Sequence, residues 1–250
     1  MKQTLQYWLS GVRLYLALGI GLITLEVWWW ATTVFDDQRL AAVRLQEVYG
    51  WISVALLAVT LLIGPVTKII INIPGKQQIR EGRRMIGIGA AWFALLHAVI
   101  AYVGQFPGSN PLELPKVYQQ SLLLGLVGLI ILMILAATSM NAVMRALGVW
   151  WFRLHRLVYV SALAVLMHAF MIGAHATSVV VLAVLALISA LWIGCNVYFL
   201  LRDPSQSVWR IIGLCYGTVL LLAVLNYGLT QHLGYNAVIQ EHKGHLEQRK

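Results

Sequence analysis

Long apolar segments separated by short polar segments recur along nearly the whole chain. Each is close to the about 20 residues that an α-helix needs to cross the hydrocarbon core of a bilayer. The pattern therefore predicts an all-α fold, a polytopic membrane helix bundle with six core helices and a seventh C-terminal helix. The expected helices cover residues 9–30, 49–71, 85–105, 119–139, 150–174, 177–200 and 209–230.

The amino-acid composition excludes a soluble domain as the main part of this chain. The chain has 250 residues, of which 60% are hydrophobic and 11% charged. A soluble domain needs more charge to cover its surface, so lipid must be the solvent for most of these residues. We expect a single membrane domain over residues 1–250, with a polar tail at 231–250 and no room for a soluble nicotinamide- or flavin-binding domain.

The net charge of +9 would suit nucleic acid, but the basic residues lie in short segments between apolar ones. That distribution sets orientation in a membrane, so we expect no nucleic-acid partner. The 18 Lys and Arg residues divide 12 to 6 between the two sides. Since the richer side is usually cytoplasmic, the N-terminus is expected in the cytoplasm, as for a multi-pass protein of a bacterial inner membrane.

Three histidines fall inside predicted helices, where ionisable side chains are costly and usually functional. His97 and His168 lie at similar depths in two helices that run in the same direction, at 85–105 and 150–174. Two neutral imidazoles from facing helices are axial ligands of a six-coordinate haem that transfers electrons. The pair thus predicts one haem b site, and the plainer alternative is an interhelical hydrogen bond. His175, seven residues after His168, has three open interpretations: an alternative ligand, a quinone contact or an interfacial histidine.

His155 lies about 20 Å to the cytoplasmic side of His168 on an ideal helix, and its level on the helix at 85–105 is Arg83 rather than a histidine. A second haem would therefore need another ligand. Arg83, Arg84 and Arg156 are better suited to bind haem propionates or the phosphate of an FMN. The histidine itself is open to either reading, as a further ligand or as an interfacial side chain.

These residues, in this order, resemble the ferric-reductase-like transmembrane family, and within it the haem-binding membrane subunits of periplasmic methionine sulfoxide reductase systems. The most specific part is the run from Leu147 to Tyr159, Leu-Gly-Val-Trp-Trp-Phe-Arg-Leu-His-Arg-Leu-Val-Tyr. Supporting features are Pro65, Arg83-Arg84 with Gly87, His97, Thr138-Ser139 and His168.

The resemblance implies a haem-binding core over residues 49–200, with haem b held by His97 and His168 and with His155 as a further candidate ligand. It implies an electron-transfer subunit of a membrane oxidoreductase, rather than an enzyme with a substrate site of its own. Electrons would come from a cytoplasmic flavin reductase or the quinone pool, and would leave to a periplasmic redox partner protein. The additional helix at 209–230 departs from the family pattern, so the partner can differ.

Two other functions remain open at this stage. One is a structural subunit of a larger membrane complex, and the other is a proton-relay or transport protein that uses the histidines as proton carriers. A transporter would be expected to show inverted repeats or paired broken helices. Neither is visible in the sequence.

Overall fold

The computed structural model describes residues 11–70, 76–105, 113–172, 179–202, 212–218 and 221, and no strand occurs among them. The long helices are α2 (Val12–Val34), α3 (Gln38–Ile69), α4 (Lys76–Gln105), α5 (Lys116–Ala137), α8 (Leu157–Ile172) and α9 (Val179–Arg202). Two short helices, α6 (Asn141–Leu147) and α7 (Val149–Leu154), lie between α5 and α8. The predicted helix bundle is confirmed.

Five spans within the described residues are long and apolar enough to cross a membrane: Val12–Val34, Gln38–Thr67, Gly82–Gly104, Tyr118–Ala137 and Val149–Met171. The chain is therefore a multi-pass membrane protein. These spans lie in one compact unit, Met1–Met171, and a second unit covers Ile172–Lys250. In the second unit, residues 212–218 are helical, within the seventh predicted helix. The rest of 209–230, apart from residue 221, lies outside the described residues, as does the predicted tail.

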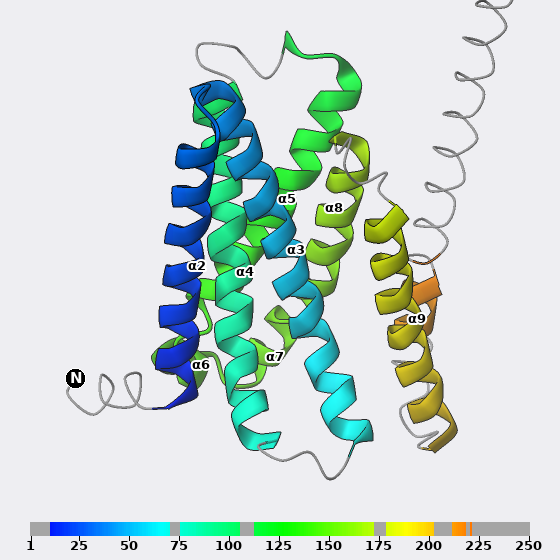
Figure 1. Ribbon diagram of the computed structural model, residues 1–250. Helices are drawn as coiled ribbons and strands as arrows, with labels where there is room; N and C mark the ends of the chain where they lie inside the picture. Colours follow the sequence, from blue (N-terminus) through cyan, green and yellow to red (C-terminus); the bar gives the residue numbers. More distant parts are fainter. Residues whose placement is uncertain are drawn as a thin grey trace, which may run out of the picture. The chain divides into compact units, whose positions relative to one another are not determined.

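The first unit is a bundle of α2, α3, α4, α5 and α8, with α6 and α7 at the end where α2 begins (Figure 1). A packed cluster of Ala31, Leu45, Tyr49 and Phe93 joins α2, α3 and α4. Tyr49 also donates a hydrogen bond of 2.8 Å to the carbonyl of Thr24, which ties α3 to α2. This cluster lies in the same half of the bundle as the side chains that form the candidate site.

The helix ends differ from the sequence prediction where a helix continues from its apolar span into the neighbouring polar segment. Helix α3 begins at Gln38, within the charged segment 31–48 that we expected to separate the first two helices. The Asp37 side chain accepts a hydrogen bond of 2.9 Å from the Arg39 backbone N–H, which caps this helix. Only residues 35–37 therefore separate α2 from α3.

The single helix predicted over 150–174 is wrong in one respect, because the structure has two helices there. Helix α7 ends at Leu154, and a turn at His155 and Arg156 precedes α8. Gly148, between α6 and α7, has a φ of 51°, a conformation that favours glycine because it has no Cβ. These breaks let the chain turn at the end of the bundle before α8 crosses the membrane.

Candidate functional site

His97 lies on α4 and is held by the backbone of α3. Its Nδ1 is 2.8 Å from the carbonyl oxygen of Gln46. A carbonyl can only accept, so Nδ1 must carry the proton, and in a neutral ring Nε2 then carries the lone pair. Phe93, one helical turn earlier, is fully buried against Tyr49, so His97 stands at the edge of a packed core.

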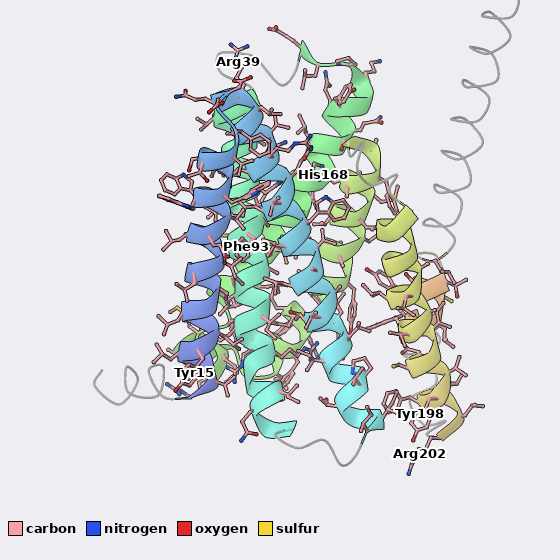
Figure 2. All side chains as sticks on the ribbon, in the orientation of Figure 1. Tyr15, Arg39, Phe93, His168, Tyr198 and Arg202 are labelled. Carbon is pink, nitrogen blue, oxygen red and sulfur yellow. The ribbon has the colours of Figure 1, made fainter. Side chains whose placement is uncertain are left out.

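His168 lies on α8 and is held in the same way by α5. Its Nδ1 is 2.8 Å from the carbonyl oxygen of Ser121 and 3.2 Å from the hydroxyl of the same residue. That hydroxyl donates a hydrogen bond of 3.1 Å to the backbone carbonyl of His168, and Ser121 is fully buried. Figure 2 labels Tyr15 near the start of α2, and it labels His168 in the opposite half of the bundle.

The structure brings these two imidazoles together although their residues are far apart in sequence. The centroids of the His97 and His168 rings are 6.1 Å apart, and the ring planes are at 82°. A metal–imidazole bond is about 2 Å and the ring centre lies about 1 Å further, so two imidazoles on opposite sides of one metal have ring centres about 6 Å apart. The pair therefore has the separation that a six-coordinate haem iron requires.

His155 is placed elsewhere, at the opposite end of the bundle and in the turn before α8. Its Nδ1 is 3.1 Å from the carbonyl of Trp151, one turn earlier in its own chain segment, and its ring stacks on Trp151 at 3.9 Å. Its Nε2 is 3.3 Å from the hydroxyl of Ser139. Both nitrogens are thus engaged by protein groups, unlike the pattern at His97 and His168.

The predicted arginines divide between two environments. Arg83 Nε donates a hydrogen bond of 2.8 Å to the carbonyl of Thr60, which fixes its side chain against α3. Arg84 Nη1 donates a hydrogen bond of 3.1 Å to Asn141 Oδ1, at the start of α6. Arg84 and His155 therefore contact the same short segment after α5, in which Ser139 and Asn141 are both buried. Arg156 is exposed in the turn beside His155.

Comparison with known proteins agrees with the resemblance that the sequence indicated. A family model described as "Ferric reductase like transmembrane component" matches residues 49–167. The predicted resemblance to the ferric-reductase-like transmembrane family is confirmed. This ferric-reductase-like segment includes His97 and His155 and ends one residue before His168.

Several known proteins are similar to this segment. A protein-methionine-sulfoxide reductase heme-binding subunit MsrQ from Pectobacterium atrosepticum is 32% identical over 128 residues, 50% of this chain and 61% of that protein. The MsrQ of Ralstonia nicotianae is 28% identical over 162 residues, 63% of this chain and 72% of that protein. The magnetosome protein MamZ of Magnetospirillum gryphiswaldense is 34% identical over 124 residues, 48% of this chain and 19% of that protein. The chain thus covers about three fifths of the first of these relatives.

Two residues of the ferric-reductase-like segment have a role in the site's geometry that the sequence reading did not assign to them. Gly50 on α3 lies against the ring of His97, and Gly125 on α5 lies against the ring of His168. Gly87 and Gly89, two glycines of α4 in the same segment, are placed differently. A Cβ at those two positions would instead meet Thr60 of α3 and Ile20 of α2, which is ordinary helix packing.

Proposed function

We propose that this chain is the haem b-binding electron-transfer subunit of a membrane oxidoreductase, in which His97 and His168 would hold the haem. The observation that carries the proposal is the 6.1 Å separation of the two rings. The backbone hydrogen bond at each Nδ1 supports it, because it leaves a lone pair on each Nε2. Two of the relatives are named heme-binding subunits, which supports the same cofactor.

When bound, a haem would supply a one-electron redox centre inside the hydrocarbon layer. The residues of this chain would hold and shield that centre. His97 and His168 would provide the two ligand nitrogens, and the carbonyls of Gln46 and Ser121 fix both imidazoles in the tautomer that leaves Nε2 able to bind iron. Tyr49 and Phe93, packed at 5.6 Å between ring centroids, exclude water from the α3–α4 side.

We propose further that electrons enter from the side where α2 begins and leave at the opposite side, near the turn between α2 and α3. The donor would be a cytoplasmic flavin reductase or the quinone pool. Arg84, His155 and Arg156 gather at the entry end and suit an anionic group, such as the phosphate of an FMN. The acceptor would be a periplasmic redox protein, and a methionine sulfoxide reductase fits the names of the two MsrQ relatives.

A visible spectrum of the purified protein tests the proposal. We expect a Soret band, and after reduction sharp α and β bands of a low-spin haem b. His97→Ala and His168→Ala should each abolish the low-spin spectrum, whereas His232→Ala, in the predicted tail, serves as the matched control and should leave it unchanged. A colourless wild-type protein that is correctly inserted would contradict the proposal and favour a structural or proton-relay subunit, in which the two histidines serve only as interhelical hydrogen-bond donors.

The angle between the ring planes adds a sharper test. Imidazole planes near perpendicular make the two ligand π-interactions with iron nearly equivalent, which gives a highly anisotropic low-spin EPR signal with a large principal g value. The 82° angle between His97 and His168 predicts that signal for the oxidised protein. A rhombic spectrum typical of parallel imidazoles would contradict the proposed pair or its geometry.

A further inference from the structure

Each of the two histidines reaches a helix carbonyl that already lies within a helical hydrogen-bond ladder. The acceptor of His97 is Gln46, and the residue four positions later on α3 is Gly50. In an α-helix the side chain at position i+4 stacks above position i and its Cβ leans toward the N-terminus. A Cβ at position 50 would therefore project over the Gln46 carbonyl, and it would lie 2.9 Å from Nδ1 of His97.

The site on α5 repeats this geometry. The acceptor of His168 is Ser121, and the residue four positions later is Gly125. A Cβ at position 125 would lie 2.8 Å from Nδ1 and 2.9 Å from Cε1 of the ring. Both distances are shorter than real Cβ contacts, so an alanine at either position could not coexist with the observed ring position. The two histidines of the candidate site are thus held by the same arrangement of carbonyl and glycine on two different helices.

Two other nitrogen donors show the same arrangement away from the paired histidines. Arg83 donates to Thr60, and a Cβ at Gly64 would lie 3.2 Å from its Nη1. In the second unit, Trp192 Nε1 donates a hydrogen bond of 3.0 Å to the carbonyl of Gly213. A Cβ at Gly217 would lie 2.8 Å from Cδ1 of Trp192. In all four cases a broad, flat donor approaches a helix carbonyl at the place where a glycine lies one turn later.

Hydroxyl donors provide the contrast. The Ser53 hydroxyl donates a hydrogen bond of 2.8 Å to the carbonyl of Ala90, and the residue four positions later is Ala94. Tyr49 donates to the carbonyl of Thr24, where Trp28 follows four residues later. A hydroxyl presents a single small atom and can pass a Cβ, whereas an imidazole brings two ring atoms alongside Nδ1. The glycines at 50 and 125 are therefore matched to the histidine rings rather than to helix contact in general.

We propose that Gly50 and Gly125 are positioning residues for the two histidines, because their missing Cβ atoms open the Gln46 and Ser121 carbonyls to Nδ1–H. This contact fixes the tautomer and the position of each ring, and so prepares both Nε2 atoms for one metal. The inference rests on the proposed function and adds to it the two residues on which the ligand geometry depends.

The test compares Gly50→Ala and Gly125→Ala with Gly21→Ala, since a Cβ at Gly21 meets nothing within 4 Å. Glycine-to-alanine changes ordinarily favour a helix, so the control should be neutral or stabilising. Each site variant should lose haem affinity by about ten- to a hundred-fold, as for other changes behind a metal ligand. The holoprotein that remains should have a changed EPR signal and a more positive midpoint potential, because a ligand without its Nδ1–H hydrogen bond is less basic.

A double variant covers the case in which Gly50→Ala fails to accumulate in the membrane. In a His97→Ala background the ring is absent, so adding Gly50→Ala should cause no further loss of accumulation or of thermal stability. Site variants with wild-type haem content, EPR signal and potential would overturn the inference while leaving the proposed function intact. A further loss in the double variant would also overturn it. A wild-type protein without haem would instead overturn the proposed function.

Discussion

Arg83 and His97 lie on one helix, α4, and each donates a hydrogen bond to a backbone carbonyl of α3, at Thr60 and Gln46 respectively. The two donors are 14 residues apart, which is about 21 Å along the helix and within about 40° of the same face. Arg83 therefore occupies, at the end of the bundle where α2 begins, a position equivalent to that of His97 at the other end. A guanidinium stays protonated and offers no lone pair to a metal, so the equivalence is one of place and not of chemistry.

This relationship predicts one haem per chain. His155, the other candidate at the entry end, has both ring nitrogens in contact with protein groups and has an arginine where a partner histidine would be needed. We expect His155→Ala to retain the low-spin haem b, in contrast to His168→Ala. Haem content by the pyridine haemochrome method, divided by protein from amino-acid analysis, measures this. A ratio near two in the wild type, or loss of half the haem in His155→Ala, would contradict it.

Phe93 is expected to be the most sensitive core position on the α3–α4 side of the site. It is fully buried against Tyr49, and truncation leaves a cavity that the helices cannot fill. We expect Phe93→Ala to reduce the free energy of unfolding by about 3 kcal/mol. Leu123→Ala is the control, since Leu123 is 61% exposed in the described structure and should change that free energy by less than about 0.5 kcal/mol. Reversible unfolding in mixed detergent micelles measures both, and equal effects would disprove the prediction.

The charge distribution predicts the orientation of the bundle. Asp36, in the turn between α2 and α3, should face the periplasm, whereas Met140, between α5 and α6, should face the cytoplasm. Both residues are exposed. In a variant with Cys195 and Cys215 replaced by alanine, a membrane-impermeant thiol reagent should label Asp36→Cys in intact spheroplasts and Met140→Cys only after permeabilisation. The opposite labelling pattern would reverse the proposed direction of electron flow.

The sequence by itself located five membrane spans and selected the candidate ligands. Apolar runs of bilayer length are a local property, so the spans could be located without knowing their neighbours. His97 and His168 could be selected because an imidazole inside such a run needs a partner, and because matched depth on parallel helices is set by the 1.5 Å rise per residue. The structure then places the two rings at the separation that this reasoning required.

Other features depended on which helix faces which, and only the tertiary structure decided them. A Cβ at Gly87 or Gly89 would meet Thr60 or Ile20 of a neighbouring helix, whereas Gly50 and Gly125 lie against the histidine rings. A glycine in a membrane helix looks the same in sequence whether it admits a helix or a side chain. What distinguishes the two cases is a donor on a neighbouring helix, aimed at the carbonyl one turn before that glycine, and this follows from the packing of the bundle rather than from either helix alone.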